Sequence, residues 1–155
     1  MMSHYALKSS HSGPALRIWL VDDDAFCRDH LTRSLNAEPR VDCARSFASA
    51  LSLLAALRQE HPPDAILMDV YMPDMNGIEA IRPVRKQAPF TRVLILTTIF
   101  DLHVKKTALA AGAAGFLLKR YPRDQLIDSL CSAGSWPRSP MTNDAPAINY
   151  QCPPA

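Results

Sequence analysis

Residues 65–86 read AILMDVYMPDMNGIEAIRPVRK, and the organisation of the chain is clearest there. The apolar run Ala65–Met68 is flanked by charge, which is typical of a strand buried on both faces of a parallel sheet. A carboxylate, Asp69, follows directly, and the turn residues PDMNG at 73–77 precede a segment with helical spacing at 78–86. The stretch therefore predicts a buried strand, a loop and a helix in succession.

The same alternation continues on both sides of this unit. Four further strands are predicted, the second of them weaker, at residues 18–21, 40–44, 93–96 and 115–118. Helical spacing recurs in four further segments, at residues 26–35, 48–58, 102–111 and 123–133. We expect Pro83 to kink the helix at 78–86 or to leave one of its amide hydrogen bonds unmade. The whole pattern predicts an α/β fold of three layers, doubly wound around a five-stranded parallel sheet.

Length and composition predict one domain with a tail at each end. The chain has 155 residues, of which 48% are hydrophobic and 21% charged, which is enough for one sizeable core. We expect the domain to span residues 16–134, after a loose N-terminal tail at 1–15. Residues 135–155 hold five prolines and show no periodicity, so we expect a Pro-rich, disordered C-terminal tail.

Charge, hydropathy and cysteines exclude several classes of protein. The net charge is +2, so there is no overall basic field of the kind that binds nucleic acid or a membrane surface. Charges interrupt every hydrophobic segment before the roughly 18 residues needed to cross a bilayer, so we expect no membrane association. The four cysteines have no metal-binding spacing, and we expect reduced thiols in a cytoplasmic protein: Cys27, Cys43, Cys131 and Cys152.

Polar residues follow the predicted strands at their carboxyl ends, which form the sheet edge where folds of this class bind ligands. They are the acidic run Asp22-Asp23-Asp24, then Asp69, Thr97-Thr98 and Lys119. A single aspartate at such a place is more often a helix cap or a solvated loop residue, so only the whole set indicates a site.

Clustered carboxylates favour a cation. Three of them in one crevice repel one another and resist ionising together unless a divalent ion is present. Oxygen ligands without a suitably spaced His or Cys favour a hard ion, Mg²⁺. A lysine and a threonine at neighbouring strand ends add the positive charge and the hydroxyl that a phosphoryl group needs. The set is therefore typical of phosphoryl chemistry.

Four segments resemble a known family: LVDDDAF at 20–26, ILMDVYMPDMNGIEA at 66–80, VLILTT at 93–98 and AGAAGFLLKRYPRDQL at 111–126. In order and spacing they are similar to the CheY-like receiver domain of two-component response regulators. The resemblance covers residues 16–134 and implies a flavodoxin-like sheet with strand order 2-1-3-4-5.

The resemblance implies a magnesium site around a phosphoacceptor. Motif by motif, Asp22 and Asp23 correspond to the family's acidic pair and Asp69 to its phosphoacceptor. These three residues, with the backbone carbonyl of Tyr71, would hold Mg²⁺. Lys119 corresponds to the lysine that pairs with the phosphorylated aspartate.

The resemblance also implies a switch. Thr97 corresponds to the hydroxyl residue that swings toward the phosphoryl group, and Phe116 to the aromatic residue that then rotates inward. The alternative is that Phe116 is an ordinary buried aromatic residue of a strand and not part of a switch. Asp24 matches no family role. Arg120 stands where the family often has proline, so we expect a trans Lys119–Arg120 peptide.

The implied partner is a sensor histidine kinase, whose phosphohistidine would supply the phosphoryl group to Asp69. The protein would accept phosphoryl groups from small phosphodonors and lose them slowly, without being an enzyme in the usual sense. The output surface would be formed by the fourth predicted helix, the fifth strand and the fifth helix. A homodimer could pair there through the charged residues Asp101, Lys105, Lys106, Arg120, Arg123, Asp124 and Asp128.

The segments GFLLKR and LTTIFDL most resemble receivers of the NarL/FixJ type, which usually carry a DNA-binding helix-turn-helix. The residues after Gly134 are few, rich in proline and poor in Lys and Arg, so we expect no direct DNA binding. The chain would then be a single-domain receiver, a truncated regulator or an expressed fragment.

Two alternatives from other functional classes stay open. A haloacid-dehalogenase-like phosphatase would also use an acidic DxD motif with Thr97 and Lys119, but it leaves Asp69 idle and needs a later acidic pair, for which only Asp124 and Asp128 follow Lys119 within the predicted domain. The other alternative is a receiver fold that serves only as a binding scaffold and is never phosphorylated. The complete set of acidic pair, acceptor, threonine and lysine argues against it.

Overall fold

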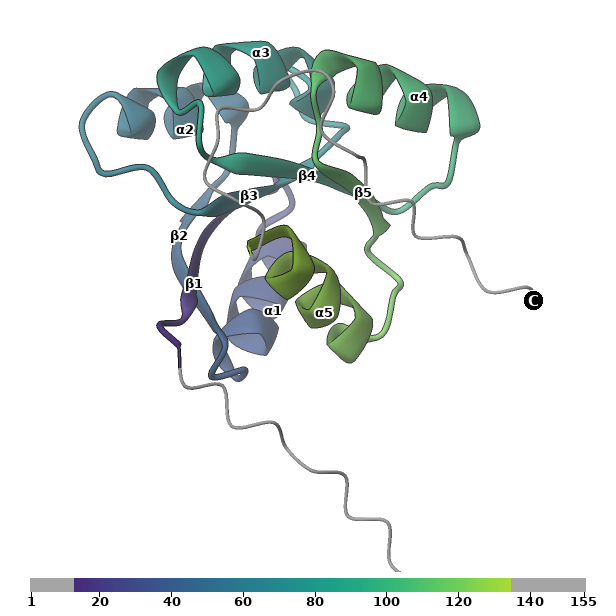
Figure 1. Cartoon of the computed structure of the whole chain (residues 1–155). Coiled ribbons are helices and arrows are strands. Elements are labelled where there is room, and N and C mark those ends of the chain that lie inside the picture. Colours follow the sequence, from purple (N-terminus) through teal and green to yellow (C-terminus); the bar gives the residue numbers. More distant parts are fainter. Residues whose placement is uncertain (1–12, 135–155) are drawn as a thin grey trace, which may run out of the picture.

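The structure is a computed structural model that describes residues 13–134 (Figure 1). The tails predicted at 1–15 and 135–155 therefore lie outside the described residues, apart from residues 13–15. Five strands and five helices alternate along the chain: β1 (Leu16–Val21), α1 (Ala25–Asn36), β2 (Val41–Phe47), α2 (Ala50–Leu57), β3 (Ala65–Asp69), α3 (Gly77–Gln87), β4 (Arg92–Thr97), α4 (Leu102–Ala111), β5 (Gly115–Leu118) and α5 (Arg123–Gly134).

The predicted fold class is confirmed. The five strands form one parallel sheet in the order β2-β1-β3-β4-β5. Helices α2, α3 and α4 cover one face of this sheet, and α1 and α5 cover the other, so the domain has three layers (Figure 1). Because all strands run the same way, the residues that follow β1, β3, β4 and β5 meet at one edge.

Alternation along the buried strands divides the core into two clusters. Trp19, Ile66, Met68 and Ile95 belong to the cluster under α2, α3 and α4. Strand residues between them, such as Leu67, join the cluster under α1 and α5. This two-sided burial explains why β1, β3 and β4 read as continuous apolar runs, since both faces of each strand are covered.

Most elements differ by one or two residues from their predicted bounds, and β2 and α2 differ for reasons that the structure shows. Strand β2 extends to Phe47, three residues beyond the predicted end. It lies at the edge of the sheet, and exposed or half-buried residues separate its buried positions Val41, Cys43 and Phe47. That alternation weakens the apolar signal. Helix α2 begins at Ala50 and not at 48, because the Ser49 side chain caps it by accepting a hydrogen bond from the amide of Ser52.

Helix α3 runs through Pro83 as one element. Proline has no amide hydrogen, so the carbonyl of Glu79 receives no helical bond from position 83, which is the unmade bond that the sequence predicts. At the start of the helix, Asn76 and Glu79 form a capping box. The first helical turn is therefore held firmly in place directly after the loop that follows β3.

Gly77 brings the start of α3 close to the end of β3. Its amide donates to the carbonyl of Val70 at 2.9 Å, and a Cβ at this position would overlap the backbone carbonyl oxygen of Asp69. Only glycine leaves room for this approach. The position of Asp69 thus depends on a residue eight positions further along the chain.

Three further observations concern the peptide bonds, the helices and the cysteines of the described residues. No peptide bond within residues 13–134 is cis, so the Lys119–Arg120 bond is trans as predicted. Over the same residues, no helix is both long enough and apolar enough to span a membrane. Cys27, Cys43 and Cys131 carry free thiols, whereas Cys152 lies outside the described part.

We predict that Gly77→Ala destabilises the fold by about 1–3 kcal/mol, because the added methyl group must displace the backbone of Asp69. Gly115→Ala is the matched control, since a Cβ there makes only ordinary contacts with Leu94. Urea unfolding of both variants measures the difference. Equal stability of the two variants would contradict the crowding argument at Gly77.

Candidate functional site

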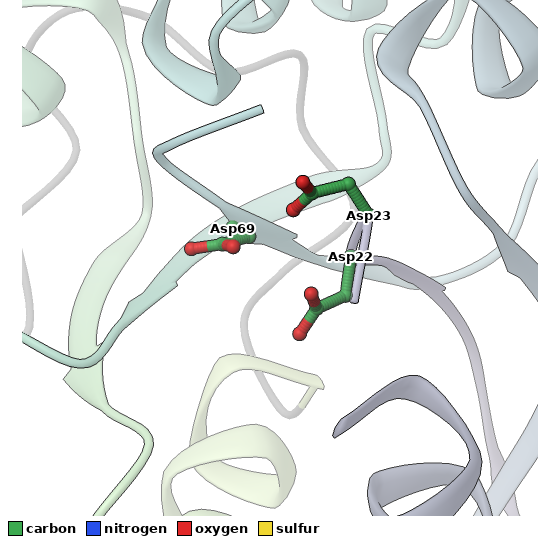
Figure 2. A group of neighbouring side chains, drawn as sticks. All are labelled: Asp22, Asp23 and Asp69. Atoms are coloured by element: carbon green, nitrogen blue, oxygen red, sulfur yellow. The ribbon is translucent and has the colours of Figure 1, made fainter. Parts of the chain in front are cut away.

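Three carboxylates gather where β1 and β3 end. These strands are neighbours, with Val21 in register with Met68, so the next residues, Asp22 and Asp69, face each other across the strand pair. One oxygen each from Asp22, Asp23 and Asp69 lies within 4.8 Å of the other two. Figure 2 shows the first two side chains leaving adjacent positions after β1, with Asp69 beside them at the end of β3.

Lys119 adds a positive charge to this group. It follows β5 directly, and its ammonium Nζ lies 2.6 Å from a carboxylate oxygen of Asp22 and 3.2 Å from one of Asp69. The backbone amide of Lys119 donates to the carbonyl of Thr97 at 2.8 Å, which fixes the start of the side chain beside β4. One lysine therefore bridges carboxylates from two other strands.

The three carboxylates differ in their exposure to solvent. Asp22 is fully buried and Asp69 is 8% exposed, whereas Asp23 is open to solvent. A second oxygen of Asp22 accepts a hydrogen bond from the amide of Asp24 at 3.0 Å. The cluster is thus firmly held on its inner side and accessible on its outer side.

Burial and charge act against each other at Asp69. Burial raises the pKa of the Asp69 carboxyl, the Lys119 ammonium partly offsets this, and the nearby charge of Asp22 raises it further. Burial alone would lower the pKa of Lys119, but the carboxylates of Asp22 and Asp69 outweigh it and the net pKa is raised. The lysine therefore stays protonated, and three carboxylates face one ammonium group.

The donor set suits a hard divalent cation. All three clustered side chains offer carboxylate oxygens, and one ammonium group leaves their negative charge only partly offset. Tyr71 lies in the loop after β3, two residues beyond Asp69, with its side chain exposed.

Thr97 and Phe116 lie on one side of the cluster. Thr97 ends β4 and is completely buried, and its hydroxyl oxygen accepts a long hydrogen bond of 3.4 Å from the amide of Ile99. Phe116 lies in β5 and is only 6% exposed. The aromatic ring expected to rotate inward is thus already buried in this structure.

Two other residues near the cluster have structural partners. Asp24 caps α1, accepting a hydrogen bond from the amide of Cys27 at 2.9 Å, and this bond lowers the pKa of Asp24. Arg28 was missed by the sequence reasoning: its Nη1 donates to the backbone carbonyl of Asp22 at 2.7 Å. The only available signal was a basic side chain less than two helical turns beyond the acidic run.

Comparison with known proteins identifies the family. The family described as "Response regulator receiver domain" matches residues 18–131. The chain belongs to this family. The chain is 33% identical over 118 residues to the uncharacterized transcriptional regulatory protein YxjL of Bacillus subtilis, with 76% of this chain and 54% of that protein covered. It is 34% identical over 135 residues to the DNA-binding transcriptional activator DevR/DosR of Mycobacterium tuberculosis, with 85% of this chain and 60% of that protein covered.

Solved receiver domains have the same fold. The signal receiver domain of the response regulator NarL from Mycobacterium tuberculosis superposes with a TM-score of 0.73 at 28% identity, covering 79% of this chain and 98% of that one. The response regulator domain of CheB from Thermotoga maritima gives 0.71 at 27% identity, with the same coverage of both chains. The chain spans little more than half the length of the two curated relatives named above.

The family match does not support the phosphatase alternative. That alternative needs Asp124 and Asp128 as the later acidic pair of a metal site, but both lie on α5 and neither is in the carboxylate cluster. Asp128 forms an ion pair with Arg40 at 3.2 Å instead. The chain is a receiver domain of a two-component response regulator.

We predict that Asp69→Asn raises the free energy of unfolding of the metal-free protein at pH 7. Burial raises the folded-state pKa of Asp69 above the unfolded-state pKa of about 3.9, so the ionised carboxylate lowers the free energy of unfolding at neutral pH. This cost disappears as the pH falls from the folded-state pKa to the unfolded-state pKa. The advantage of the variant should therefore shrink on acidification. Urea unfolding in the presence of a chelator measures it.

Asp42→Asn is the control for this comparison, because Asp42 is an exposed carboxylate on the edge strand β2. Asp42→Asn should leave the free energy of unfolding unchanged, both at pH 7 and after acidification. A lower stability of Asp69→Asn at neutral pH would show that the contact with Lys119 outweighs the cost of burying the Asp69 charge.

Proposed function

We propose that Asp69 is the phosphoacceptor of this receiver and that Asp22, Asp23 and the backbone carbonyl of Tyr71 join it in holding Mg²⁺. The observation that carries the proposal is the position of Lys119, whose ammonium group contacts Asp22 at 2.6 Å and Asp69 at 3.2 Å. A cation beside the acceptor and a neighbouring acidic pair that can hold Mg²⁺ would supply the positioning and charge neutralisation on which phosphoryl transfer depends.

The proposed donor is a phosphohistidine of a sensor histidine kinase. An Asp69 carboxylate oxygen attacks the phosphorus, a new O–P bond forms, and the P–N bond to the imidazole breaks. The imidazole leaves with the electron pair and takes up a proton, so the product is an acyl phosphate on Asp69. Bound Mg²⁺ would neutralise charge on the phosphoryl oxygens.

Lys119 has a third partner available in the product, besides Asp22 and Asp69. Its ammonium group already lies beside Asp69, so a phosphoryl oxygen on that carboxylate comes within reach of the same donor. Thr97, at the end of the neighbouring strand β4, offers a hydroxyl group at the same edge of the sheet. We propose that this hydroxyl leaves the amide of Ile99 for the phosphoryl group.

The proposed receiver domain spans residues 16–134. All five of its helices pack on the sheet, and the net charge of the chain is only +2, so there is no overall basic field to hold DNA. We propose that these residues do not bind DNA directly and that the kinase is the partner that phosphorylates them in the cytoplasm. Small phosphodonors would replace the kinase in solution, and hydrolysis would remove the phosphoryl group slowly.

The proposed output is a homodimer through the surface formed by α4, β5 and α5. Its charged residues have unequal roles in this structure: Asp101 caps α4, and Asp128 is paired with Arg40. Lys106, Arg120 and Asp124 are exposed there and could pair across a two-fold axis.

We predict that Asp69→Asn abolishes incorporation of a phosphoryl group, since an amide cannot act as the nucleophile. Intact-protein mass spectrometry after incubation with acetyl phosphate and Mg²⁺ measures this. Asp24→Asn is the control, because it changes a carboxylate at the same edge of the sheet and keeps a good helix cap. The control should be labelled like the wild type, and labelling of Asp69→Asn would reject Asp69 as acceptor.

We predict that Mg²⁺ stabilises the wild type by about 1.4 kcal/mol at ten times its dissociation constant. Asp23→Ala should lose most of this stabilisation at the same concentration, because one ligand charge is removed. It should also stabilise the metal-free protein by relieving repulsion with Asp22 and Asp69. Thermal unfolding with and without Mg²⁺ tests both effects, and an unchanged Mg²⁺ response in Asp23→Ala would argue against the site.

We predict that a phosphoryl analogue, beryllofluoride with Mg²⁺, increases self-association and that added salt reduces it, because exposed ion pairs are screened beyond a Debye length of about 8 Å at physiological ionic strength. Light scattering at two salt concentrations measures both effects. A receiver that stays monomeric under every condition would refute the proposed dimer.

A further inference from the structure

An aromatic pair links the loop after β4 to strand β5. The ring of Phe100 meets that of Phe116 edge to face, with centroids 6.4 Å apart and planes at 86°. Phe100 is 51% exposed, whereas Phe116 is only 6% exposed. The ring in the loop therefore lies between the strand aromatic and the solvent.

The start of α4 leaves the Phe100 ring available for this contact. Phe100 directly precedes Asp101, the residue that caps α4. A hydrophobic residue before a cap often packs against the fourth residue of its own helix, but that residue here is Lys105. Phe100 makes its aromatic contact across to β5 instead.

The same loop also contacts Thr97. The amide of Ile99, the residue before Phe100, donates to the Thr97 hydroxyl at 3.4 Å. Ile95 is in register with Phe116, and Thr97 is in register with Leu118. Alternation therefore places Thr97 on the same face of the sheet as Phe116, one diagonal position away. Adjacent loop residues thus contact both residues of the proposed switch.

From this arrangement we infer that Phe100 is a positioning residue that holds the Phe116 ring in its buried position. The inference rests on the proposed function, in which the Thr97 hydroxyl moves toward a phosphoryl group on Asp69. That movement leaves space on the face of the sheet that Phe116 shares. A ring kept buried by Phe100 fills the space and so favours the displaced threonine.

The first test is binding of beryllofluoride with Mg²⁺ to the full chain, measured by calorimetry. Phe100→Ala should weaken the affinity roughly two- to tenfold, the range expected for loss of an edge-to-face pair. Phe100→Tyr keeps the ring edge and should restore wild-type affinity. Ile99→Ala is the matched control, because Ile99 is an apolar residue of the same loop, 60% exposed, and the variant keeps the amide that bonds to Thr97.

A double-mutant cycle separates positioning from a general effect on stability. In a Phe116→Ala background, Phe100→Ala should cause no further loss of affinity, since its proposed effect passes through that ring. In ¹⁹F NMR spectra of protein labelled with fluorophenylalanine, the Phe116 resonance of Phe100→Ala should become more sensitive to exchange of H₂O for D₂O. Ile99→Ala should leave that resonance unchanged.

The outcomes distinguish the two levels of the proposal. A wild type that neither binds beryllofluoride nor is phosphorylated would overturn the proposed function and this inference together. A wild type that binds normally, with unchanged affinity in Phe100→Ala or an equal loss in Ile99→Ala, would overturn the role of Phe100 alone. Additive losses in the double variant would also overturn it.

Discussion

The Lys119 ammonium group lies between the carboxylates of Asp22 and Asp69, and the arrangement of the site depends on this contact. Two carboxylates on adjacent buried strand ends lose hydration and repel each other, so without a cation they would destabilise the folded chain. The lysine offsets part of this cost. The remaining negative charge, to which Asp23 contributes at the solvent side, is what makes this edge of the sheet suitable for a divalent cation.

The strand order is what brings these groups together. Asp22 and Asp69 follow β1 and β3, which are neighbours in the sheet, whereas Lys119 follows β5, which is separated from β3 by β4. A short basic side chain could not cross that distance, but the flexible four-carbon stem of lysine can. Gly77 also positions Asp69, because it lets α3 begin close to β3, and this close approach limits where the backbone of Asp69 can lie. Asp69 is therefore constrained both through its side chain, by Lys119, and through its backbone, by the start of α3.

Most of the fold and the acidic cluster could be predicted from the sequence, because both depend on local patterns. The run Ala65–Met68 is apolar at every position since both of its faces are covered, and the carboxylate after it marks the strand end. The full length of β2 was less evident, because an edge strand alternates in burial. The contacts of Arg28 and Phe100 could not be predicted, because each depends on how separate elements meet in space. No short sequence motif indicates such a contact.

The contacts around the site differ in strength, and this difference indicates where conformational change begins. The bridge between Lys119 and the buried carboxylates is short and charge-assisted, so it resists opening. The loop after β4 is held by a neutral hydrogen bond of 3.4 Å to Thr97 and by a half-exposed ring on Phe116. Segments with few buried contacts and long hydrogen bonds open at low free-energy cost. A new negative group on Asp69 would therefore draw the Thr97 hydroxyl away from its weak partner before it disturbed the core, and the loop would be the first element to respond.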